Sequence, residues 1–170
     1  DDPLEKFYAL QMLSSSMDKE EIKGHILMLF KNDNPYIIKS SFKLCESNEI
    51  LGLEDEIAPF MNHQDKELAK MACYEYARLT KEEGIEVLKQ KFDTADKHQK
   101  NAVIGAAIKY CGLPGAIEFG RELLNLIDSD NEKDRKDGAY IIGAIANKNY
   151  YSPLIKLNKD VSSEVRQAAI

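Results

Sequence analysis

Large apolar side chains recur along the chain at a nearly constant interval. One column of them reads Ile26, Ile57, Leu88, Leu123 and Leu154. Four residues further on, a second column reads Phe30, Met61, Phe92, Ile127 and Asn158. Apolar residues at i and i+4 form a stripe on one face of an α-helix, and the alternation typical of strands is nowhere sustained. The pattern predicts one short amphipathic helix per interval, which we name the second helix.

A first helix is predicted ahead of each second helix, because a polar or proline-containing turn opens every interval. Its inner positions align in two columns of mostly small side chains. The first column reads Ala9, Ser40, Met71, Ala102, Asp137 and Ala168, and the next reads Leu10, Ser41, Ala72, Val103, Gly138 and Ala169. Side chains of this size let neighbouring helices approach closely.

These columns divide the chain into segments 2–32, 33–63, 64–94, 95–129 and 130–160, with 161–170 opening a sixth. The fourth segment has four extra residues, which we expect to enlarge the turn near Gly112, Pro114 and Gly115. Helix pairs of this length bury their apolar faces only when stacked on neighbours. The sequence therefore predicts an all-α solenoid of stacked antiparallel helix pairs, forming a single domain over 1–170.

The last two segments resemble the HEAT-repeat family, particularly the short bacterial HEAT-like repeats. The resemblance lies in DVSSEVRQAA (160–169) and in DNEKDRKDGAYIIGAI, where Arg135 and Arg166 are 31 residues apart. It implies a right-handed solenoid, with an Asp-to-Arg ladder restricted to these two segments. The column of these arginines holds Phe7, Ile38, Ala69 and Lys100 in the earlier segments. A TPR array is disfavoured by its longer period and its absent Trp, Gly-Tyr and Pro signature.

Charge argues against nucleic acid as a partner. The net charge is −6, and Lys and Arg alternate with Glu as in KEEGIEVLKQK, which indicates solvated helix faces rather than a phosphate-binding track. Only Lys148, Lys156 and Lys159 form a local positive excess. The longest apolar run, HILMLF, is far shorter than a bilayer-spanning helix, so no membrane insertion is expected within this segment.

Catalytic, cofactor and metal sites are not predicted. The three histidines, His25, His63 and His98, lack ligand partners at helical spacing beyond a single Glu for each of the first two. The glycines of GLPGAIEFG do not follow a dinucleotide-binding pattern. The three cysteines, an odd number, are expected to be reduced core residues, which favours a cytoplasmic location, including the cytoplasmic side of a membrane protein.

We therefore expect a non-enzymatic scaffold that presents helix surfaces to a protein partner or to the rest of its own polypeptide. The order of motifs such as EKFYALQML and NYYSPLIKL also resembles the HEAT-repeat region of bacterial nucleotide-carrier-like (ADP/ATP carrier-like) transporter fusions. That resemblance implies the alternative of a soluble cytoplasmic region in a larger membrane protein. Phycobilin lyases are likewise similar to short HEAT-like repeats, which leaves a lyase-like subunit as a third alternative.

The partner-binding surface is predicted on the second helices, away from their buried stripe. Positions beside the aliphatic column define a ridge of eight residues: Met28, Lys31, Glu86, Gln90, Arg121, Asn125, Ser152 and Lys156. Arginine is enriched among residues that dominate interfaces, so Arg121 is the expected anchor. The chain opens without Met, and 161–170 begins a helix pair without completing it. From this we expect a fragment of a longer chain.

Overall fold

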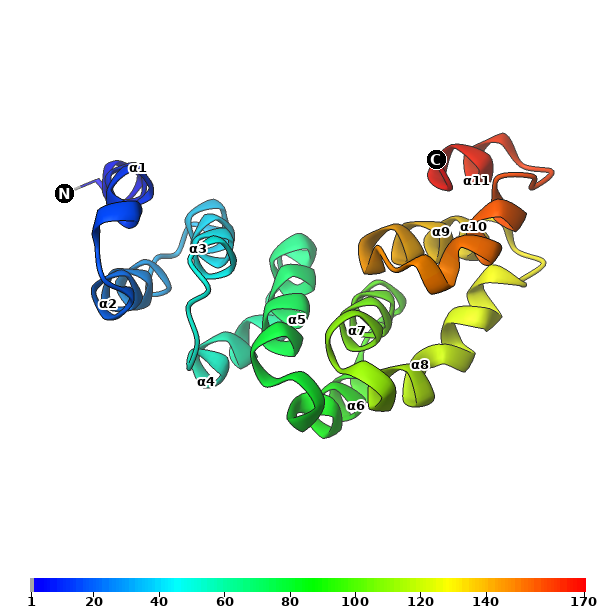
Figure 1. The fold of residues 1–170 in the computed structure, drawn as a ribbon, viewed down its shortest axis with the longest axis horizontal. Coiled ribbons are helices and arrows are strands. Elements are labelled where there is room, and N and C mark those ends of the chain that lie inside the picture. Colours follow the sequence, from blue (N-terminus) through cyan, green and yellow to red (C-terminus); the bar gives the residue numbers. More distant parts are fainter. Residues whose placement is uncertain (1) are drawn as a thin grey trace. The chain divides into compact units, whose positions relative to one another are not determined.

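The structure, a computed structural model, describes residues 2–170 and is all-helical, without a strand in that range. The predicted all-α class is confirmed. The chain divides into two compact units, residues 1–79 and residues 80–170. Figure 1 colours the chain in sequence order, from blue at the N-terminus to red at the C-terminus. The boundary falls at the end of a first helix, within the predicted third segment.

The first unit is built from α-helices with three short 3₁₀ or α segments at their ends. In chain order these are α1 (Pro3–Leu13), η1 (Ser14–Ser16), α2 (Lys19–Leu29), α3 (Pro35–Ser47), α4 (Glu54–Ile57), η2 (Ala58–Asn62) and α5 (Lys66–Thr80). Helix α3 packs against both α1 and α2. The rings of Phe30, Phe42 and Phe60 meet edge to face, with centroids 5.3–5.8 Å apart, an arrangement that aromatic quadrupoles favour.

A charged pair closes the first unit beside α5. Arg78 donates to both carboxylate oxygens of Glu75, at 2.8 and 2.6 Å, and to the carbonyl oxygen of Ile50 at 3.0 Å. Burial raises the pKa of the Glu75 carboxyl, and the Arg78 guanidinium opposes that rise. The hydrogen bond from Arg78 to Ile50 attaches the turn after α3 to α5. The ion pair with Glu75 matters because an isolated buried charge would be costly.

The second unit continues with η3 (Lys81–Gly84), α6 (Ile85–Thr94), α7 (Lys97–Tyr110), α8 (Gly112–Ile127), α9 (Glu132–Ile145), η4 (Lys148–Tyr150), α10 (Tyr151–Leu157) and α11 (Ser163–Ala168). Helix α7 packs against α6, α8 and α9, and α9 packs against α8, α10 and α11. First helices α7, α9 and α11 thus follow one another through direct contacts, with α8 lying against both α7 and α9 (Figure 1).

The first helices begin at regular intervals. From α3 onward their N-cap side chains are Asn34, Asp65, Asp96, Asn131 and Ser162, each accepting a hydrogen bond from a backbone N–H of the first turn. The intervals are 31, 31, 35 and 31 residues. Two residues before four of these caps, another side chain accepts the backbone N–H of the cap residue itself: Asn32, His63, Ser129 and Asp160. The same turn is therefore built from four different residue types.

The aliphatic column is buried through its first four members. Ile26, Ile57 and Leu88 are 0% exposed and Leu123 is 1% exposed. The last member differs, because Leu154 is only half-buried and Leu157, three residues later, is the buried residue of α10.

The expected enlarged turn in the fourth segment is not what the structure shows. Only Cys111 separates α7 from α8, and the extra residues lengthen α8 to 16 residues. Gly112 makes the reversal with a φ of +58°, a conformation that costs glycine little. A Cβ on Gly115 would lie 2.1 Å from the carbonyl oxygen of Ala107, so glycine is required where α8 crosses α7.

Candidate interaction surface

The eight ridge residues are all exposed. Met28, on α2, and Lys31, just after it, belong to the first unit. The other six lie in the second unit, in pairs on successive second helices: Glu86 and Gln90 on α6, Arg121 and Asn125 on α8, Ser152 and Lys156 on α10. The surface is therefore described separately for each unit, and the second unit carries most of it.

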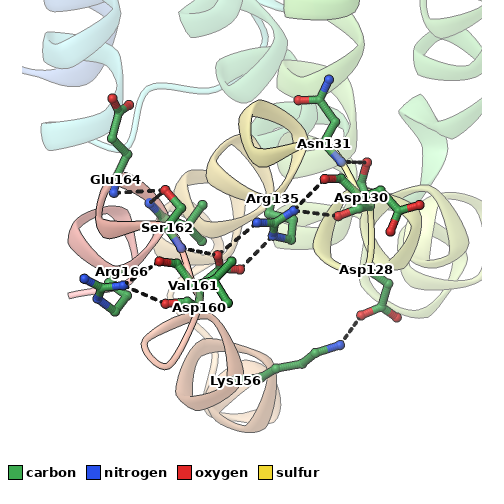
Figure 2. Close-up of polar contacts among 12 residues, drawn as sticks. Asp128, Asp130, Asn131, Arg135, Lys156, Asp160, Val161, Ser162, Glu164 and Arg166 are labelled. Carbon is green, nitrogen blue, oxygen red and sulfur yellow. Dashed lines mark hydrogen bonds and ion pairs between the residues drawn. The ribbon is translucent and has the colours of Figure 1, made fainter.

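Ion pairs join the second helices of the second unit along their exposed sides. The Lys89 ammonium lies 3.5 Å from Glu86 on its own helix and 3.4 Å from Glu118 on α8. The Glu118 carboxylate, followed by Glu86, raises the pKa of Lys89. Just after the C-terminal end of α8, Asp128 pairs with Lys156 of α10, as Figure 2 shows. The structure thus brings Glu86 close to α8 and Lys156 close to the end of α8.

An exposed apolar row on α8 was not predicted from the sequence. Leu113 is 70% exposed, Ile117 71% and Leu124 54%. Gly120 lies between the last two on the same face, since these positions are separated by four, three and four residues. The neighbouring face of α8, about 90° around the helix, buries Phe119, Leu123 and Ile127. The signal was present in LPGAIEFGRELLNLI, which carries more apolar residues than one buried stripe requires.

A polar ladder connects the turns at the C-terminal end of the second unit. Arg135 donates to both carboxylate oxygens of Asp160, at 2.7 and 2.9 Å, and to the carbonyl oxygens of Ser129 and Asp130. In the next turn between helices, Arg166 makes the same contacts, donating to the carbonyl oxygens of Asp160 and Val161 at 2.8 and 3.0 Å (Figure 2). Each arginine therefore binds the two carbonyl groups five and six residues before it.

Asp160 connects these two turns. The Arg135 guanidinium and the backbone N–H of Ser162 lower the pKa of the Asp160 carboxyl to about 2, against a partial burial that works in the other direction. The carboxylate is thus ionised at neutral pH and saturated with donors. A carboxylate held this way orders a loop; it is a poor general base, because its pKa is far below neutrality.

The cysteines and histidines do not form a reactive centre. Burial raises the pKa of Cys45 to about 12 and that of Cys111 to about 11, so both thiols stay protonated at neutral pH. The His63 ring accepts the backbone N–H of Asp65 and so serves the turn before α5. Among residues 2–170, no three His, Cys, Asp or Glu side chains converge as metal ligands do.

A hollow of about 380 Å³ lies between α1 and α3 in the first unit. Its lining includes the aromatic ring of Phe7 and the hydroxyls of Ser14, Ser40 and Ser47, with Lys43 as the charged member. Ser14 and Ser47 already donate to backbone carbonyl groups of their own helices. Two of the three hydroxyls that line the hollow are therefore already engaged within the unit.

No protein-family model matches the chain, and no curated protein matches it. The HEAT-like resemblance therefore depends on the residues and intervals described above. No helix in the described part of the chain is both long enough and apolar enough to cross a bilayer.

Proposed function

We propose that this protein is a non-enzymatic scaffold, a solenoid of HEAT-like helix pairs that binds a protein partner through its second helices. Three observations support the stacking. N-caps recur at 31- and 35-residue intervals, column residues are buried at those intervals, and first helices α7, α9 and α11 pack consecutively in the second unit. Stacked helix pairs of this kind build an extended surface from equivalent positions of successive repeats.

The observation that carries the binding proposal is the exposed apolar row of α8 beside Arg121. Isolated exposed apolar residues are ordinary, whereas aligned ones next to an arginine are typical of interaction surfaces. Within the described residues no carboxylate forms an ion pair with Arg121. Its guanidinium is therefore available to a partner, which fits the role of an interface anchor.

The test is a binding titration with a partner isolated on the immobilised protein. A double charge reversal, Glu86→Lys with Arg121→Glu, is expected to weaken binding at least about fivefold, because both residues lie on the ridge. Lys133→Glu is the matched control, since Lys133 is an exposed lysine on the first helix α9. Unchanged affinity in the double variant, with loss in the Lys133 variant, would place the binding surface on the first helices instead.

A further inference from the structure

The hollow between α1 and α3 is bordered by one face of each helix. On α1 the lining residues Phe7 and Gln11 are four positions apart, which places them one above the other. On α3 the lining residues Ser40, Lys43 and Leu44 share a face in the same way. The volume of about 380 Å³ lies within the range of pockets that hold small molecules.

The sequence explains why this space is open. One interval of 31 residues later, the position of Ser40 holds Met71 and the position of Ser47 holds Arg78. The guanidinium of Arg78 is largely buried there and is bonded to Glu75. Serine at both positions of α3 puts two small side chains where the next first helix has two large ones. The hollow is therefore specific to the pairing of α1 with α3.

Ser40 presents an unbonded hydroxyl to the hollow. The residue is only 7% exposed, and no group among the described residues forms a hydrogen bond with its side chain. Its neighbour Ser41 instead donates to the carbonyl oxygen of Ile37 at 2.9 Å, as serines inside helices often do. No side-chain N or O atom of the described residues is both sealed from solvent and unbonded, so the Ser40 hydroxyl is reached through the hollow that it lines. Buried hydroxyls normally have a partner, and here a ligand can supply it.

Lys43 makes the hollow suitable for one negative charge. It is exposed, and no carboxylate of the described residues forms an ion pair with it. Among the described residues that line the hollow, none carries a carboxylate. Ser14 and Asn48, the C-cap residues of α1 and α3, also line it, so the negative ends of two helix dipoles border the space. A dianion such as phosphate is disfavoured in that setting, whereas a single charge beside Lys43 is neutralised.

We propose that this hollow binds a small monocarboxylate that carries an apolar ring. The carboxylate accepts from the Lys43 ammonium and the Ser40 hydroxyl, and the ring lies against Phe7 and Leu44. These two side chains are 6% and 4% exposed, so a ring placed on them is removed from water with little rearrangement. The Gln11 amide on α1 offers a further donor. The site is separate from the ridge and goes beyond the proposed scaffold function.

A titration of the ¹⁵N-labelled protein with benzoate, followed by NMR, tests the site. We expect saturable shifts of backbone amides in α1 and α3, with a dissociation constant of about 1 mM, as befits so small a ligand. Benzamide, which has the same shape without the charge, and inorganic phosphate should each bind at least about tenfold more weakly. No shifts at about 10 mM benzoate, equal affinity for benzamide, or tighter binding of phosphate would overturn the proposal.

Two variants locate the carboxylate. Lys43→Gln and Ser40→Ala should each weaken benzoate binding at least about fivefold, because each removes one donor. Lys109→Gln is the matched control, since Lys109 is an exposed lysine near the end of the first helix α7 and lies outside the hollow. Equal losses in the Lys43 and Lys109 variants would mean that benzoate binds through unspecific charge, and would overturn the site. Binding of the isolated protein partner by Lys43→Gln is expected to be unchanged, so the scaffold function is decided separately.

Discussion

Arg135 binds Asp160 with two hydrogen bonds, across 25 residues of chain. The same guanidinium donates to the carbonyl oxygens of Ser129 and Asp130, so one side chain holds the turn before its own helix and the turn before the next. A planar guanidinium suits this task because its donors point along two edges at once. The carbonyl contacts, which Arg166 repeats to Asp160 and Val161, explain why arginine follows both turns in the last two segments.

Stability should depend on pH through Asp160. Its folded pKa of about 2 lies below its ordinary value, so its stabilising effect is complete above pH 5 and is lost as pH falls toward 2. We expect the difference in unfolding free energy between wild type and Asp160→Asn to shrink steadily over that window. Urea unfolding at a series of pH values measures it. A difference that stays constant from pH 6 to pH 2.5 would mean that the carboxylate charge is not what stabilises the turn.

Leu88→Asp should unfold or strongly destabilise the protein. Leu88 is 0% exposed on α6, and a buried unpaired carboxylate costs about 3 kcal/mol or more. Gln90→Asp is the control on the same helix, because Gln90 is exposed and outside the ion pairs of Lys89. Thermal unfolding followed by circular dichroism compares them, and similar melting temperatures for the two variants would contradict the assigned register.

Gly115→Ala tests the close crossing of α7 and α8. The new Cβ would lie 2.1 Å from the Ala107 carbonyl oxygen, which forces the helices apart and should cost about 1–3 kcal/mol. Gly143→Ala is the matched change, since Gly143 lies inside α9 with open space around it. There the gain in helix propensity should raise stability by about 0.5–1 kcal/mol. Opposite signs in chemical denaturation are the expected result.

Arg78→Met should lower the free energy of unfolding, because it leaves the buried carboxylate of Glu75 without its ion-pair partner. Burial raises the pKa of Glu75 and the Arg78 guanidinium lowers it, so removing the guanidinium lets the pKa rise further. A raised carboxyl pKa favours the protonated folded form, so the variant should lose stability as pH rises from 4 to 7. The expected loss at neutral pH is about 3–5 kcal/mol. The double variant Arg78→Met with Glu75→Leu should recover most of it, and an equally unstable double variant would mean that Arg78 acts mainly through Ile50.

The period of the chain was readable from sequence because buried positions tolerate few residue types. Ile26, Ile57 and Leu88 align without reference to any contact, and their burial follows from helical spacing. The length of α8 was not readable, because Gly112 and Pro114 favour a turn locally and tertiary packing of Gly115 on α7 decides otherwise. The shared hydrogen bond in the turns before the first helices was not predicted, for a different reason. Asn32, His63, Ser129 and Asp160 have different side chains with one shared hydrogen bond, which no residue column displays.

The exposure of the ridge residues was predicted from their angle to the buried stripe, whereas the apolar row beside them was not predicted, although α8 carries more apolar residues than one buried stripe requires. Leu123 belongs to the aliphatic column and was predicted to be buried, whereas the exposure of its neighbour Leu124, a residue of the same type, follows from the orientation of α8 on α7 and α9. The orientation depends on Gly115 and the reversal at Gly112, which no local pattern specifies.

Two substitutions should create a second pair like Arg135–Asp160 in the preceding segment, where the sequence lacks one. Ser129 makes the same hydrogen bond to the N-cap as Asp160 does, and Lys100 occupies the arginine position one segment earlier. Ser129→Asp alone adds a carboxylate near Asp134, which already accepts from Ser129, and should destabilise through repulsion. Lys100→Arg alone should have little effect, because either cation can lie over the ring of Phe92.

Together, the two changes should recreate the bidentate pair of Arg135 and Asp160, with a favourable coupling of about 0.5–1 kcal/mol in a double-mutant cycle. The control cycle uses Lys100→Gln with Ser129→Asp, which cannot form the two-edged contact. A coupling that is absent with arginine, or equally large with glutamine, would mean that the turns before α9 and α11 are not equivalent in space. The repeat register derived from N-caps and buried columns would then hold along the sequence alone, without a shared geometry behind it.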